Sequence, residues 1–216
     1  MKKFLLAVLA AAAIAALPAS PAAQTAIPKS GLPVLTTSAG QSNDANTVNA
    51  VLEEADIKYD YCDVPTVEML AAGVGLAGKT SAAGFHVEVT TDLVKYPKGT
   101  PYKTVILAIG ASLKGMGASG LTTDSEEVRV KKLIDACKKA KIFVIGVHAG
   151  GDAARGPAGS DNERMIDAVA PFADFLVITK DSDKDGRFTK IAAKTKAPMI
   201  KVDFALGMVE IMKKVF

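Results

Sequence analysis

The chain has 216 residues, of which 26 are Lys or Arg and 23 are Asp or Glu. A formal charge of +3 is too small to favour nucleic acid or an anionic membrane surface as a partner, because such binding requires many basic residues to neutralise phosphates. The length suits one domain with a sizeable core, and two Cys residues are too few for a disulfide-dense scaffold.

The first 22 residues have the pattern of a secretory signal peptide. Two lysines precede an unbroken apolar run over residues 4–17, and small side chains at Ser20 and Ala22 predict cleavage before Ala23. An uncleaved anchor is the alternative, but the run is shorter than the roughly 20 residues that a membrane span needs. Cleavage would remove two of the 26 basic residues, leaving 24 against 23 acidic ones. We therefore expect a nearly neutral periplasmic or secreted protein, with no membrane insertion after signal cleavage.

The next part of the chain alternates short apolar runs with amphipathic segments. An Ala- and Pro-rich stretch over residues 23–32 predicts a tether, and we expect a single domain over residues 33–216. The predicted elements of its first half are a strand at 33–37, a helix around 48–55, a strand near 59–64, a short helix at 66–72, and an edge strand or hairpin at 85–90.

Three continuous runs of apolar, mainly β-branched residues follow, at 104–109, 142–147 and 175–179. Continuous apolarity indicates strands that are buried on both faces, as in a parallel sheet covered by helices. The predicted helices are one to residue 140 with a capping box of Asp124 and Glu127, one to residue 170 capped by Asp161 or Asn162, one at 187–196 and one at 205–216, with a last strand at 199–202. The pattern predicts a three-layer, doubly wound, mostly parallel α/β sheet, Rossmann-like or flavodoxin-like, of five or six strands.

In such sheets ligands bind at the carboxyl ends of the strands, where the strand order reverses. The loops over residues 38–44 and 110–120 follow two predicted strands and consist mainly of small and hydroxyl residues. A helix beginning near Asp44 and the charge of Lys114 both favour an anion. The alternative is that these residues only cap a helix and turn the chain. The candidate ligand-binding residues here are Ser38, Gly40, Gln41, Ser42, Asp44, Gly110, Ser112 and Lys114.

His148 ends the strand at 142–147, and Arg155 follows in the next loop, so both join the candidate ligand-binding set. A His in this position could carry a proton; alternatively it holds the Gly-rich loop by hydrogen bonds. A Ser/His/Asp hydrolase using Ser112, His148 and Asp152 is the enzymatic alternative. The G-x-S-x-G elbow is incomplete, because Lys114 stands at the second glycine position.

Two further motifs are partial. Gly115, Gly117 and Gly120 match G-x-G-x-x-G, but no helix follows directly and no acidic residue ends the next strand, so we expect no nicotinamide cofactor. The D-x-D-x-D-G segment, with Asp181, Asp183 and Asp185, resembles the front half of a calcium loop. Its bidentate Glu is missing, so a solvated turn that caps the next helix is the alternative, and we expect no required cofactor.

Cys62 and Cys137 both fall in predicted elements with apolar neighbours. We expect them to be small buried hydrophobes, although export would permit a disulfide between them.

The runs at 35–42, 109–117 and 144–148, with the stretch from 180 to 190, resemble an uncharacterised family of exported bacterial α/β domains, a domain of unknown function. The resemblance implies the compartment and the fold and no activity. From the loop chemistry we expect a small-molecule binding protein with an anion-favouring crevice. The alternatives are the serine-type hydrolase and a structural role, in which the edge strand at 85–89 contacts a second copy or an envelope partner.

Overall fold

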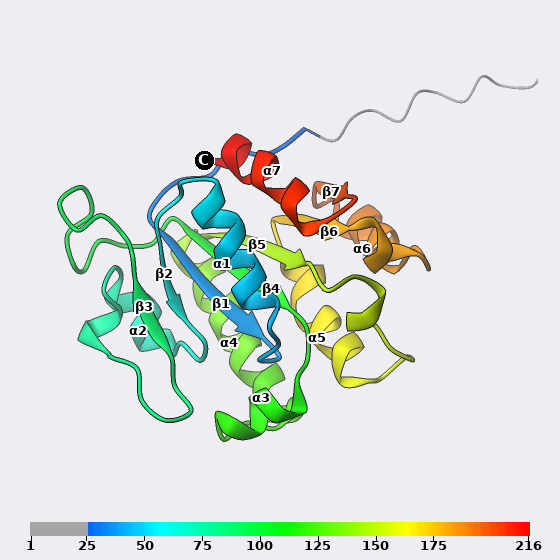
Figure 1. The fold of residues 1–216 in the computed structure, drawn as a ribbon, viewed down its shortest axis with the longest axis horizontal. Helices are drawn as coiled ribbons and strands as arrows, with labels where there is room; N and C mark the ends of the chain where they lie inside the picture. Colours follow the sequence, from blue (N-terminus) through cyan, green and yellow to red (C-terminus); the bar gives the residue numbers. More distant parts are fainter. Residues whose placement is uncertain (1–25) are drawn as a thin grey trace, which may run out of the picture.

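The computed structural model describes residues 26–216, so the predicted signal peptide lies outside the described residues. One sheet has the strand order β3-β2-β1-β4-β5-β6-β7, and every neighbouring pair is parallel except β2 and β3 (Figure 1). The strands are β1 (Val34–Ala39), β2 (Tyr59–Cys62), β3 (Val87–Val89), β4 (Thr104–Ile109), β5 (Phe143–His148), β6 (Phe175–Thr179) and β7 (Met199–Val202).

The prediction of a mostly parallel α/β sheet is confirmed, but the predicted number of strands is wrong, because the sheet has seven. The difference lies at the β3 edge of the sheet. The strand β3 has three residues, and its alternating pattern did not decide between an edge strand and a separate hairpin. In the structure Asp60 pairs with Val89 and Cys62 with Val87, so β3 extends the sheet as an antiparallel edge strand.

The helices are α1 (Asp44–Glu54), α2 (Val67–Ala72), α3 (Leu113–Ala118), α4 (Thr123–Ala140), α5 (Asp161–Val169), α6 (Arg187–Thr195) and α7 (Met208–Val215). They cover both faces of the sheet. Figure 1 shows α1 in front of the central strands and α4 behind them. Side chains of α1 and α7 pack with Val34, Ile106 and Val147 in one core. Those of α2, α4, α5 and α6 pack with Leu35 and Val105 in the other. Alternate strand residues thus point to opposite cores, which explains the continuous apolar runs.

Some helix starts differ from the predictions. The capping box of α4 is formed by Thr122 and Ser125 and not by Asp124 and Glu127. The latter two side chains instead bind the guanidinium of Arg164 on α5. The Asp124–Glu127 spacing predicted the wrong cap because Thr and Asp both occur at the cap position. The backbone geometry, which the sequence does not give, decides that the helix begins after Thr122.

The helix α5 begins at Asp161, with Ser160 in the cap position and no side-chain capping bond. The predicted cap Asn162 accepts a hydrogen bond from the Ala111 N–H at 2.8 Å instead. The short helix α3 was not predicted, because Gly115 and Gly117 lower the helix propensity of its sequence.

Cys62 on β2 and Cys137 on α4 are both fully buried in the same core, and neither is in a disulfide. The prediction that they are small buried hydrophobes is confirmed. Within residues 26–216, no helix combines the length and the apolarity needed to cross a bilayer.

Candidate functional site

The loops after β1 and β4 lie side by side, because β1 and β4 are neighbours where the strand order reverses. Gln41 and Ala111 form an isolated β-bridge, and the Ser112 N–H donates to the Gly40 carbonyl at 2.7 Å. Gly40 has a φ of 104°, and a Cβ there would collide with the Gly110 carbonyl and with Ala111. The two loops that the sequence singled out therefore meet, and glycine is required where they touch.

A buried ion pair on α4 fixes the first of these loops. The Glu126 carboxylate accepts the Gly40 N–H at 2.8 Å and the Gln41 amide at 3.2 Å. Arg129 donates to Glu126 at 2.7 Å and to the Ser38 carbonyl at 2.6 Å. Burial raises the pKa of Glu126, but its bonds to Arg129, Gly40 and Gln41 outweigh this and bring the pKa below its usual value. Sequence reasoning missed this pair; the available signal was a Glu and an Arg three residues apart on α4.

A pocket of about 320 Å³ opens at the carboxyl ends of β1 and β2, and we call it the carboxyl-edge pocket. Of the predicted residues, Ser38, Gln41 and Ser42 line it. Within the described part of the chain no Lys or Arg contributes to its lining. The polar lining residues that the prediction omitted are Asn43, Asn46, Tyr61, Asp63, His86 and Ser119.

One buried and one half-buried polar group belong to this pocket. Ser38 is 1% exposed, and its hydroxyl has no hydrogen-bond partner among the described residues. Strand alternation places this side chain on the same face as Thr36, which donates to Asn49 of α1. Burial raises the pKa of Asp63, although its carboxylate accepts the His86 N–H at 2.9 Å. The pocket therefore offers an unused hydroxyl and a carboxyl group whose charge is disfavoured.

Asp44 is the first residue of α1, and its carboxylate lies against the ends of β4 and β5. A Cβ on Gly150 would lie 3.1 Å from both carboxylate oxygens of Asp44, and a Cβ on Gly110 would collide with one of them. One carboxylate oxygen is buried without a partner, and burial raises the pKa. The N-terminus of α1 thus already faces an acidic side chain, which disfavours an anion at this place.

Ser112 directly precedes α3 and Lys114 lies in its first turn, and neither lines the carboxyl-edge pocket. The Ser112 hydroxyl accepts the Gly115 N–H at 3.0 Å and so caps α3, and the Lys114 side chain is exposed. In this loop the geometry therefore matches the alternative interpretation, in which these residues cap a helix and turn the chain.

His148 is fully buried, and both of its ring nitrogens have partners. Nδ1 lies 2.7 Å from the Ser182 hydroxyl, and Nε2 lies 3.2 Å from the Ala154 carbonyl. The ring also packs edge-on against Phe188 at a centroid distance of 5.2 Å. Burial lowers the pKa of His148 to about 4. This geometry is that of a histidine that holds the Gly-rich loop in place.

The structure does not bring Ser112, His148 and Asp152 into a hydrogen-bonded relay. Asp152 instead forms an ion pair with Lys184 at 3.3 Å. The guanidinium of Arg155, the other candidate in this loop, binds Glu163 and Asp185 at 2.6 and 2.8 Å.

The three aspartates of the D-x-D-x-D-G segment have separate partners. Asp183 accepts the Phe188 N–H at 2.7 Å and pairs with Lys201. Asp185 accepts the Arg187 N–H at 3.1 Å, so both carboxylates accept backbone N–H groups from the first turn of α6, whose cap position is Gly186. The exposed Asp181 lies 3.9 Å from Lys184. Residues 26–216 contain no group of three or more His, Cys, Asp or Glu side chains that could hold a metal ion.

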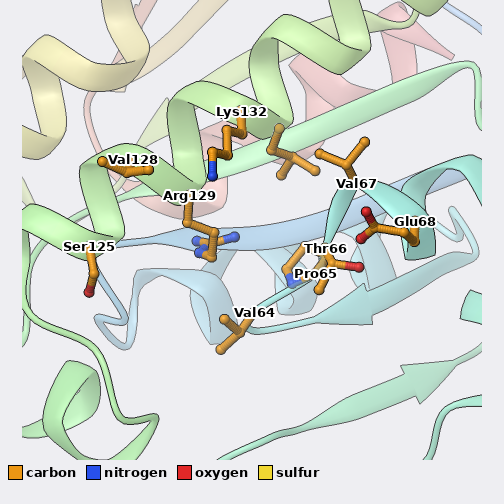
Figure 2. A pocket seen from close by; sticks show the side chains of 10 residues that line it. Val64, Pro65, Thr66, Val67, Glu68, Ser125, Val128, Arg129 and Lys132 are labelled. Carbon is orange, nitrogen blue, oxygen red and sulfur yellow. The ribbon is translucent and has the colours of Figure 1, made fainter.

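A second cavity, of about 340 Å³, lies between the segment 64–68 and α4, and we call it the α2–α4 groove. Figure 2 shows Arg129 and Lys132 on the α4 side and Glu68 on the α2 side. Sequence reasoning did not find this groove, because α2 and α4 are brought together only by the packing of both helices on one face of the sheet.

Residues 31–216 match a known protein family, described as Domain of unknown function (DUF6305). No curated protein and no solved structure matches the chain. The match covers both candidate cavities and the whole described sheet, and it confirms the resemblance to a domain of unknown function. The chain therefore belongs to the DUF6305 family.

Proposed function

We propose that the protein is an exported small-molecule binding protein whose ligand occupies the carboxyl-edge pocket. The observation that carries this proposal is the Ser38 hydroxyl, which is buried among the lining residues without a partner. A buried hydroxyl without a hydrogen bond costs about 1–3 kcal/mol, and a ligand group that reached it would recover part of that cost. The pocket also lies at the edge of the sheet where ligands of α/β proteins bind.

The chemistry of the lining favours a neutral, hydroxyl-rich ligand. The amides of Asn43 and Asn46 both donate and accept hydrogen bonds, as the hydroxyl groups of a sugar or polyol do. Tyr61 and His86 place their rings 5.6 Å apart and supply an aromatic wall. The anion expected from Lys114 fits this pocket less well, because its lining holds the carboxyl group of Asp63 and Lys114 lies outside it.

The test is a thermal-shift screen with monosaccharides and polyols beside matched carboxylates and phosphate esters. A ligand that binds only the folded state raises the melting temperature. We expect a neutral hydroxylated compound to do so, and Asn46→Ala to weaken its binding on the order of tenfold, since a lost hydrogen bond is worth about 1 kcal/mol or more.

The control is Glu54→Ala, an exposed change at the far end of α1 that should leave binding unaltered. The proposal is wrong if no neutral compound stabilises the protein, or if the compounds that do so stabilise Asn46→Ala to the same extent.

A further inference from the structure

The α2–α4 groove has hydrocarbon on both of its walls. Val64, Pro65 and Val67 form one wall, and Val128 and Leu133 of α4 belong to the other. Val128 is 53% exposed and Val67 is 36% exposed, so part of this apolar surface is open to solvent. Covering it with an apolar group of a ligand would be favourable.

The α4 side of the groove also carries two cations. Arg129 and Lys132 are three residues apart and therefore share one face of the helix. Two nitrogens of Arg129 are bound to Glu126 and to the Ser38 carbonyl, but Nη1 is buried without a partner among the described residues. An unpaired N–H on a buried guanidinium is an open position for an acceptor.

Lys132 is the second cation of the groove. Its neighbours on α4 are paired, Lys131 with Asp135 and Lys138 with Asp174, whereas Lys132 has no ion-pair partner within residues 26–216. In Figure 2 its amino group and the Arg129 guanidinium point into the same space. Two like charges that face one cavity repel each other, and an anion between them would relieve this repulsion.

Glu68 limits which anion can bind. Its backbone N–H and the Thr66 hydroxyl lower the pKa of Glu68, and Lys132 contributes to the same effect, so the side chain is ionised. Glu126 already neutralises part of the Arg129 charge. The two cations at the groove are thus balanced by two carboxylates, so the groove disfavours a dianion such as a phosphate ester, whereas a single carboxylate adds only one charge beside the unpartnered Nη1.

We propose that the α2–α4 groove is a binding site for a small carboxylate with an apolar tail. The carboxylate lies between Arg129 Nη1 and Lys132, and the tail covers Val67 and Val128. This site is separate from the carboxyl-edge pocket and belongs to a different ligand class.

The experiment is a calorimetric titration of the protein with hexanoate and phenylacetate, with 1-hexanol as the uncharged counterpart of hexanoate. We expect at least one of the carboxylates to bind and hexanol to bind on the order of tenfold more weakly, because a hydrogen bond to a charged group is worth about 1.5–3 kcal/mol. Lys132→Gln should weaken carboxylate binding by a similar factor, and Glu68→Gln should strengthen it.

The matched control is Lys139→Gln, which removes the same charge from an exposed position on α4 outside the groove. It should leave the affinity unchanged. Arg129 is left intact, since its loss would break the buried pair with Glu126. The proposal is overturned if neither carboxylate binds, if hexanol binds as tightly as hexanoate, or if Lys132→Gln has no more effect than Lys139→Gln.

Discussion

At the scale of single residues, His148 shows how burial changes the role of a side chain. A His with an ordinary pKa near 6.5 could carry protons, but here burial lowers the pKa to about 4 and Ser182 and Ala154 engage both ring nitrogens. The residue is therefore neutral at physiological pH and contributes to stability rather than to chemistry.

This predicts a specific dependence of stability on pH. Between pH 6.5 and about 4 the unfolded chain takes up a proton at His148 that the folded chain does not, so the free energy of unfolding falls as the pH falls. The loss amounts to roughly 3 kcal/mol across this window. Urea unfolding of the protein and of His148→Asn at several pH values checks it, since the variant should show a flatter slope. Equal slopes in the two proteins would refute the assignment.

The same residue shows where sequence reasoning reaches its limit. Its position at the end of a strand was predictable from the apolar run before it. Its hydrogen bond to Ser182, 34 residues further along, was not, because that contact depends on β5 and β6 being neighbours in the sheet. The carboxyl-edge pocket was likewise predictable only in part. Ser38 and Gln41 were found from one loop, whereas Tyr61 and Asp63 come from the end of another strand.

At the scale of elements, the long helix α4 has a structural task that goes beyond covering the sheet. Its Glu126–Arg129 pair holds the β1–α1 loop through Gly40, Gln41 and the Ser38 carbonyl. Removing one partner of a buried ion pair leaves the other charge uncompensated.

We therefore expect Glu126→Gln to lower the free energy of unfolding by about 3 kcal/mol or more. The neighbouring Glu127→Gln is the matched control, because Glu127 forms a partly exposed pair with Arg164 and should cost less than about 1 kcal/mol. Chemical denaturation of both variants at neutral pH measures the difference. Equal losses in the two variants would show that the buried Glu126–Arg129 pair contributes no more to the free energy of unfolding than the partly exposed Glu127–Arg164 pair.

The elements themselves were predictable to different degrees. The strands β4, β5 and β6 were found because burial on both faces leaves a continuous apolar run. The short helix α3 was missed because its glycines lower the helix propensity of the sequence. The cap of α4 was missed because the spacing of two acidic residues is a weak local signal for where a helix begins. The edge strand β3 was located but not counted, because three residues give too little pattern to establish pairing.

At the scale of the whole molecule, the proposed function includes export. The N-terminal segment lies outside the described residues, and its pattern predicts cleavage before Ala23. We expect the protein recovered from the periplasm or the medium of a bacterial host to begin at Ala23, as N-terminal sequencing or intact mass would show. A chain deleted of residues 2–22 should stay in the cytoplasm. Recovery of the uncut chain from the membrane would instead support an anchor.

The two cysteines are shielded from solvent in the folded molecule. Burial raises the pKa of Cys62 and of Cys137 to about 12, so neither thiol reacts while the core is closed. Each thiol becomes reactive only when the element that carries it, β2 or α4, opens. The rate at which a thiol reagent labels each cysteine therefore reports the rate of that opening. In an oxidising compartment the closed core also shields both free thiols from an oxidant.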